Sequence, residues 1–85
     1  MSVTTVLVVD DEPTIRDVVV RYLEREGYRT LEAGDGDLAK TLVESEQPDL
    51  VVLDLMLPGI DGLEVCRRLR QAGDVAVLML TARSE

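Results

Sequence analysis

The chain has 85 residues, 46% of them hydrophobic and 31% charged, with a net charge of −8, one cysteine and no histidine. This length suits one small domain, and the composition is that of a folded chain and not of a disordered tail. Without histidine there is no histidine base, no histidine metal ligand and no Ser-His-Asp triad. Because the 17 Asp and Glu residues outnumber the 9 Lys and Arg residues, we expect no direct nucleic-acid binding by this chain.

Membrane and secretory features are also missing from the sequence. No stretch approaches the ~20 continuous apolar residues of a membrane-spanning helix, and the first residues lack the basic segment of a secretory signal. Cys66 alone forms no internal disulfide, which suits a reducing cytosol. We therefore expect a cytoplasmic protein without membrane contact, in which Cys66 is a small buried hydrophobe and not a reactive thiol.

The first third of the chain predicts a strand followed by a helix. Residues 3–9 (VTTVLVV) are nearly all apolar, as in a strand buried on both faces, and an acidic segment ends this run. A helix is expected from Pro13 to Gly27, with Asp11 or Glu12 as its cap. Its apolar positions, at helical spacing, are Ile15, Val18, Val19, Tyr22 and Leu23.

The same alternation continues through the rest of the chain. Residues 28–33 (YRTLEA) predict a partly polar edge strand, residues 49–53 (DLVVL) a buried strand ending at Asp54, and residues 75–80 (VAVLML) a fourth strand. Two helices are expected between them. The second helix is marked by Leu38, Ala39, Leu42 and Val43 and ends before Pro48; the third has Asp61 as its cap, carries Leu63, Cys66 and Leu69, and stops at Gly73. The order β-α-β-α-β-α-β predicts the α/β class, with a parallel sheet and right-handed crossovers.

Polar side chains stand at the ends of three of these strands. In an open parallel sheet, ligands bind outside the carboxyl ends of the strands. Asp10 and Asp11 follow the first strand, Asp54 the third and Thr81 the fourth. If the first and third strands are neighbours, the three carboxylates converge and repel one another. A hard cation with oxygen ligands relieves this repulsion, so the sequence predicts an Mg²⁺ site.

Such a site suits phosphoryl transfer. A carboxylate acts as a nucleophile toward phosphorus and forms an aspartyl phosphate, while the metal neutralises charge on the transferred group. Asp54 is the best nucleophile candidate because it stands alone at the end of a central strand. The Thr81 hydroxyl can donate a hydrogen bond to a phosphoryl oxygen.

Simpler roles remain open for each of these residues. Asp10 or Asp11 can serve only as a helix cap, Asp54 can open the turn before Pro58, and Thr81 can be an ordinary turn residue. Against this, Asp54 has apolar neighbours on both sides, where an unpaired carboxylate is costly.

A second motif points to a different ligand. Residues 34–39 (GDGDLA) match the G-x-G-x-x-A pattern of dinucleotide-binding loops. However, Asp35 and Asp37 would lie where a pyrophosphate must approach, and the strand before the motif is polar. The sequence disfavours dinucleotide binding.

Three segments resemble the receiver domain of two-component response regulators. Residues 6–19 (VLVVDDEPTIRDVV) resemble the first strand and acidic pair of that family, and residues 48–70 (PDLVVLDLMLPGIDGLEVCRRLR) resemble its phosphoacceptor strand and the following loop. Residues 77–83 (VLMLTAR) resemble its fourth strand and switch threonine. The resemblance covers the whole chain.

This resemblance implies a fold and a set of roles. The fold is the doubly wound, flavodoxin-like sheet with strand order 2-1-3-4-5. Asp54 is implied as the phosphoacceptor, Thr81 as the switch residue, and Asp10, Asp11, Asp54 and the Met56 backbone carbonyl as the Mg²⁺ ligands. The implied phosphoryl donor is the phosphohistidine of a sensor histidine kinase.

The chain departs from the family pattern at its end. A receiver continues with a fourth helix, a fifth strand carrying a lysine near the phosphate, and a fifth helix, whereas the single lysine here, Lys40, matches no such position. We expect residues 1–85 to be a single receiver domain that is incomplete at its C-terminus. The fourth strand would then be a hydrophobic edge that favours self-association or swapping.

The function expected from the sequence is that of a phosphoacceptor signalling domain and not of an enzyme. Analogy with residues 57–70 suggests the N-terminal part of a DNA-binding transcriptional regulator. An alternative is a non-phosphorylated interaction or assembly module of the same fold. A stand-alone phosphotransfer enzyme is disfavoured, because the sequence shows no base and no substrate pocket.

Overall fold

The computed structural model describes residues 3–54 and 62–80, without the side chains of residues 54, 63, 79 and 80. Strands and helices alternate along these ranges as β1 (Thr5–Val9), α1 (Pro13–Arg25), β2 (Arg29–Ala33), α2 (Gly36–Glu46), β3 (Leu50–Asp54), α3 (Gly62–Ala72) and β4 (Ala76–Leu80). The predictions on Met56, Pro58, Asp61 and Thr81 lie outside the described residues. No helix in the described part is long and apolar enough to cross a membrane.

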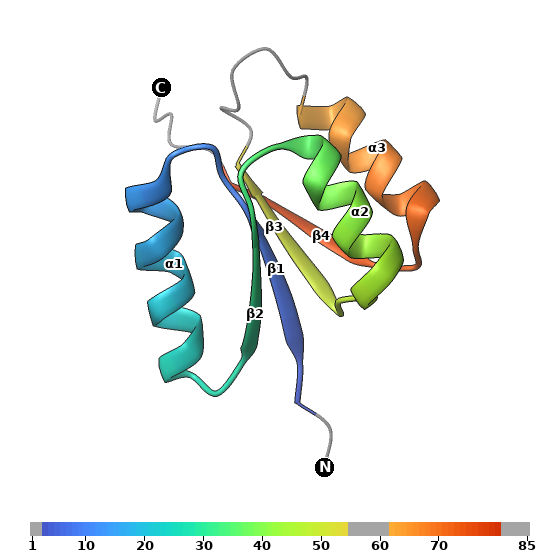
Figure 1. The fold of residues 1–85 in the computed structure, drawn as a ribbon. Helices are drawn as coiled ribbons and strands as arrows, with labels where there is room; N and C mark the ends of the chain where they lie inside the picture. Colours follow the sequence, from blue (N-terminus) through green and yellow to red (C-terminus); the bar gives the residue numbers. More distant parts are fainter. Residues whose placement is uncertain (1–2, 55–61, 81–85) are drawn as a thin grey trace.

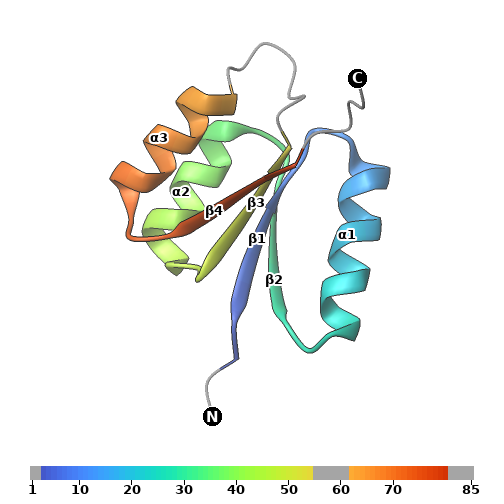
Figure 2. The same ribbon diagram turned by 180° about the vertical axis from the view of Figure 1, so that it is seen from behind.

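The described strands form one parallel sheet in the order β2-β1-β3-β4 (Figure 1). β1 pairs with β2 and with β3, and β4 pairs with β3. Helix α1 covers one face of the sheet, while α2 and α3 lie side by side on the other, as the view from behind also shows (Figure 2). The α/β class, the parallel sheet and the order 2-1-3-4 are confirmed.

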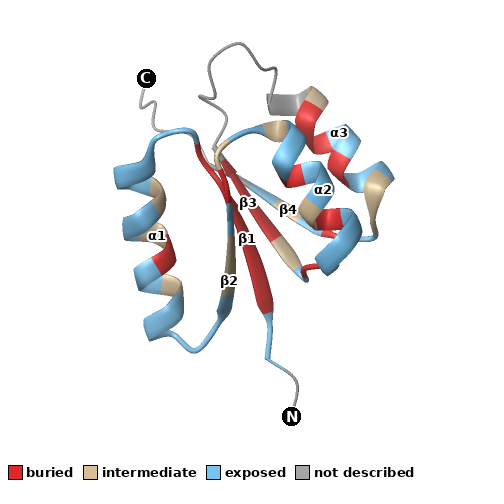
Figure 3. Ribbon diagram, viewed as in Figure 1, coloured by how far each residue is buried: buried red, intermediate tan, exposed pale blue. Residues whose placement is uncertain are grey.

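The core has two parts because successive side chains of a strand point to opposite faces of the sheet. In β1, Leu7 and Val9 belong to the larger part, beneath α2 and α3. Val6 and Val8 belong to the smaller part, with Val20 of α1. Burial therefore runs along the whole of β1 (Figure 3), as predicted for a strand covered on both faces. Cys66 is buried in the larger part, which confirms its role as a small core residue.

The apolar face predicted for α1 is only partly buried. Val19 and Leu23 pack against the smaller part of the core. Ile15, Val18 and Tyr22 are 53%, 61% and 62% exposed. The predicted helical spacing is therefore confirmed, but the apolar face of α1 is wider than the part of it that the described sheet buries.

The structure moves the start of β2 from Tyr28 to Arg29. The backbone N–H of Tyr28 donates to the carbonyl of Leu23 at 3.1 Å, and that of Gly27 donates to the carbonyl of Glu24 at 3.1 Å. Gly27 has a φ of +93°, a left-handed conformation that favours glycine. These bonds satisfy carbonyls in the last turn of α1, so Tyr28 belongs to the turn that follows this helix and not to the strand.

Candidate functional site

The pairing of β1, β3 and β4 brings the carboxyl ends of these strands together. Val9 of β1 lies opposite Leu53 of β3, and the next residues along the two strands are Asp10 and Asp54. Asp54 itself lies opposite Leu80 of β4. The condition on which the predicted metal site depended, that the first and third strands are neighbours, is therefore met.

Asp10 is buried and is held at three of its atoms. Only 5% of the residue is exposed. Its N–H donates to the carbonyl of Ala33 at 3.1 Å, its Oδ1 accepts from the N–H of Glu12 at 2.9 Å, and its carbonyl oxygen accepts from Nη1 of Arg16 at 2.7 Å. Both the backbone and the carboxylate of Asp10 are thus fixed at the end of β1. A carboxylate kept at such a position is suited to holding a cation.

The residues after Asp10 divide two roles between them. Asp11 is exposed. Glu12 is the N-cap of α1, and its side chain accepts from the N–H of Thr14 at 3.4 Å. The cap predicted at Asp11 or Glu12 is therefore Glu12, and neither Asp10 nor Asp11 is the N-cap of this helix.

The remaining predicted site residues are not tested by the structure. Asp54 is the last residue of β3, but its side chain is outside the description, as are Met56 and Thr81 altogether. Among the described side chains, no three acidic or cysteine groups gather at one point. The convergence of Asp10, Asp11 and Asp54 thus remains a prediction, supported by the backbone pairing of β1 and β3.

Arg16 and Glu32 are residues of this region that the sequence analysis missed. Nε of Arg16 lies 3.2 Å from Oε1 of Glu32 on β2, while its Nη1 contacts the carbonyl of Asp10. One signal was present in the sequence: an arginine in the first turn of a helix opposes the helix dipole, so it needs a partner outside the helix.

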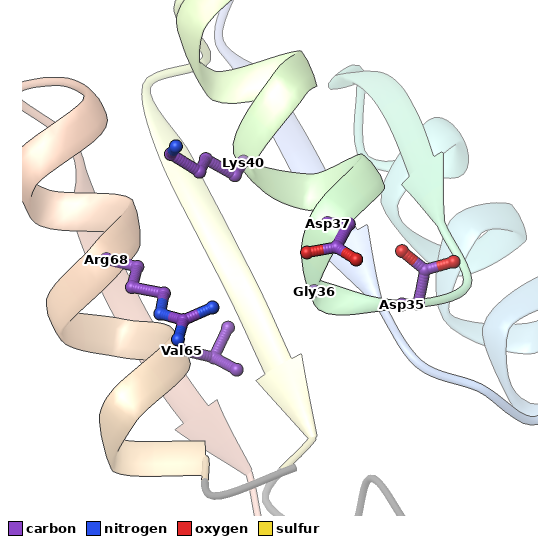
Figure 4. Close-up of a pocket in the computed structure, with 6 residues that line it drawn as sticks. All are labelled: Asp35, Gly36, Asp37, Lys40, Val65 and Arg68. Carbon is purple, nitrogen blue, oxygen red and sulfur yellow. The ribbon is translucent and has the colours of Figure 1, made fainter. Parts of the chain in front are cut away.

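The G-x-G-x-x-A motif forms the start of α2 and lines a different cleft. Oδ1 of Asp35 accepts from the N–H of Leu38 at 2.8 Å, which makes Asp35 the N-cap and occupies an amide that a phosphate would use. The cleft, of about 260 Å³, lies between α2 and α3 (Figure 4). Its lining residues are Asp35, Gly36, Asp37, Lys40, Val65 and Arg68. Lys40 thus faces α3 and not the end of β1. The N-cap bond of Asp35 and the second aspartate of the motif, Asp37, agree with the prediction against dinucleotide binding.

The fold and the acidic strand ends define a class of protein: a parallel α/β domain of order 2-1-3-4 with a buried aspartate after its first strand. Residues 6–85 match the family model described as the response regulator receiver domain. The chain belongs to this family, so it is a receiver domain, which fits two-component signalling.

Individual relatives agree with this assignment. The chain is 48% identical over 80 residues to the DNA-binding response regulator MtrA of Mycolicibacterium smegmatis, a match that covers 94% of the chain and 35% of MtrA. The N-terminal domain of a response regulator receiver protein from Methanoculleus marisnigri is similar with a TM-score of 0.89 and 45% identity, over 99% of this chain and 71% of the other. The chain therefore spans about a third of MtrA.

A third relative was solved in a phosphorylated form. A response regulator protein from Burkholderia pseudomallei, with a phosphorylated aspartic acid, a calcium ion and citrate, has a TM-score of 0.87 and 30% identity to this chain. The match covers 96% of this chain and 49% of the other.

Proposed function

We propose that this chain is a phosphoacceptor, in which Asp54 receives a phosphoryl group from the phosphohistidine of a sensor histidine kinase. The observation that carries the proposal is the pairing of Val9 with Leu53, because the residues that follow them are Asp10 and Asp54, of which Asp10 is buried. The family supports the same role, since a relative with 30% identity was solved with a phosphorylated aspartic acid.

Mg²⁺ is the cofactor proposed for this step. The donor set fits it, because Asp10, Asp11, Asp54 and the Met56 carbonyl offer only oxygen ligands. When bound, the ion neutralises negative charge on the transferred group. The fixed Oδ1 of Asp10 leaves the side chain few alternative positions, so its part of the site is formed in advance.

The transfer exchanges one bond to phosphorus for another. A carboxylate oxygen of Asp54 attacks the phosphorus, an O–P bond forms, and the N–P bond to the donor histidine breaks. The histidine nitrogen keeps the electron pair of that bond. Thr81 is the proposed switch residue, which donates a hydrogen bond to a phosphoryl oxygen once Asp54 is phosphorylated. The chain supplies the acceptor and turns over no further substrate, so we propose a cytoplasmic signalling domain and not an enzyme.

The output of the signal is proposed from the relatives. MtrA is a DNA-binding response regulator, and this chain matches 35% of it. We propose that the chain works as the receiver part of a transcriptional regulator, with DNA binding supplied by another part of the protein.

We also propose that the 85-residue chain associates with itself through β4. Among the described residues, β4 pairs with β3 only, and its sequence AVLML carries no charge. Leu78, in the middle of this strand, is 50% exposed. An uncharged edge strand with an exposed leucine favours pairing with another chain.

The phosphoacceptor role is tested by intact mass measurement after incubation with Mg²⁺ and acetyl phosphate. We expect one added phosphoryl group, lost in the Asp54→Ala variant and after removal of Mg²⁺. Asp17→Ala is a matched control, since this aspartate of α1 is exposed and forms an ion pair with Arg21 of the same helix. An unmodified chain, or modification that survives Asp54→Ala, would contradict the proposal and favour a non-phosphorylated assembly module.

A further inference from the structure

Arg16 has a position in its helix that is electrostatically unfavourable for an arginine. It lies in the first turn of α1, where a positive charge opposes the helix dipole. Its side chain is only 21% exposed, whereas the other arginines in ion pairs, Arg21 among them at 76%, are mostly exposed. The position of Arg16 must therefore be explained by its contacts.

Those contacts join three segments at the carboxyl edge of the sheet. Nη1 donates to the carbonyl of Asp10 at 2.7 Å, in the segment between β1 and α1. Nε donates to Oε1 of Glu32 on β2 at 3.2 Å. A methyl group added at Gly34, just after β2, would lie 3.2 Å from Nη1, so the guanidinium fits closely over this glycine.

We propose that Arg16 is a positioning residue of the candidate metal site, which holds the Asp10 backbone so that the Asp10 and Asp11 carboxylates face the cation. The inference rests on the proposed function. Glu32 supports Arg16 from β2 and keeps the guanidinium directed at the Asp10 carbonyl. Arginine suits this role because its planar fork reaches two acceptors at once, which an ammonium group does less well.

The charge of Arg16 and its positioning role have opposite effects on Mg²⁺ binding. A positive charge near the site repels Mg²⁺. If Arg16 acted through its charge alone, the chain would bind Mg²⁺ more tightly after Arg16→Gln and with unchanged affinity after Arg16→Lys. A positioning residue gives weaker binding in both variants. Loss of a residue that orients a metal ligand typically costs roughly 10–100-fold in metal affinity.

The test is Mg²⁺ titration by calorimetry on the full 85-residue chain, at a temperature where circular dichroism shows each variant folded. We expect roughly 10-fold weaker binding, or more, for both Arg16→Gln and Arg16→Lys. Arg21→Gln is the matched control on the same helix, and we expect no change there. Glu32→Ala should weaken binding less, and should add nothing to Arg16→Gln, because the two residues act through one contact.

A second measurement needs no metal. In the metal-free chain, we expect the Asp10 and Glu12 amides to exchange hydrogen faster in Arg16→Gln, with Val52 of β3 unchanged, because the segment after β1 opens locally. Tighter Mg²⁺ binding by Arg16→Gln, or unchanged exchange at Asp10 and Glu12, would overturn the inference. Failure of the unaltered chain to bind Mg²⁺ would instead overturn the proposed function, and the exchange result would still decide whether Arg16 positions Asp10.

Discussion

Asp10 shows how much of a site can be predicted from one residue and its neighbours in sequence. Its place after an apolar run predicted a carboxylate at the end of a strand, and the structure confirms that location. The contact with the Arg16 guanidinium could not be predicted in the same way, because it is made to a backbone carbonyl six residues away. Every residue has a backbone carbonyl, so the sequence does not indicate which carbonyl will accept a side-chain hydrogen bond.

Substitution of Asp10 should affect both stability and Mg²⁺ binding. Asp10→Asn retains an oxygen that accepts from the Glu12 N–H, whereas Asp10→Ala removes this acceptor. In metal-free buffer, we expect the free energy of unfolding of Asp10→Ala to be about 1 kcal/mol lower than that of Asp10→Asn, so Asp10→Ala should unfold at a lower urea concentration. Both variants should lose Mg²⁺ affinity, since both remove the charge. Urea denaturation followed by circular dichroism and Mg²⁺ titration measure the two effects.

Asp11→Asn separates metal binding from stability. Asp11 is exposed, so its substitution should leave the urea midpoint nearly unchanged while weakening Mg²⁺ binding. Equal Mg²⁺ affinity in the chain and in both asparagine variants would remove Asp10 and Asp11 from the proposed metal site.

At the scale of elements, the alternation of apolar runs and helical spacing predicted every described strand and helix in the right order. The starts of strands were less predictable. Asp49 was expected in β3, but its Oδ2 accepts from the N–H of Thr5 at 2.8 Å, and β3 begins at Leu50. A polar residue that bonds to a neighbouring strand through its side chain cannot be told apart from a strand residue by periodicity alone.

The proposed self-association of β4 predicts a specific effect of charge. Leu78→Lys places a charge on the exposed face of this strand, which disfavours pairing with a second chain. We expect the unaltered 85-residue chain to show concentration-dependent association in sedimentation velocity, and Leu78→Lys to shift it toward monomer.

Val18→Lys is the control for a general effect of exposed apolar side chains. Val18 is 61% exposed on α1, a helix that contacts β1 and β2 and, among the described residues, not β4. We expect this variant to associate as the unaltered chain does. Loss of association in Val18→Lys alone would place the contact on α1, and a monomer at all concentrations would refute self-association.

At the scale of the whole molecule, the strand order decides whether a site exists. Apolar periodicity indicates which residues form strands, but not which strands are neighbours. The order 2-1-3-4 came from the resemblance to receiver domains, and the structure confirms it. Asp10 and Asp54, which are 44 positions apart in sequence, belong to one site only because β1 lies beside β3. The Asp54 side chain, Met56 and Thr81 remain predictions.

The net charge of −8 gives the molecule two distinct responses to cations. Any salt weakens repulsion between surface carboxylates, so NaCl should raise stability gradually. Mg²⁺ that binds only the folded chain should add about 2.7 kcal/mol at 100 times its Kd. We expect thermal unfolding at matched ionic strength to show a higher midpoint in MgCl₂ than in NaCl for the unaltered chain. In Asp10→Asn that difference should disappear, while the response to NaCl remains. An equal gain from both salts in the unaltered chain would mean that Mg²⁺ acts only by screening and that the three aspartates form no site in the folded state.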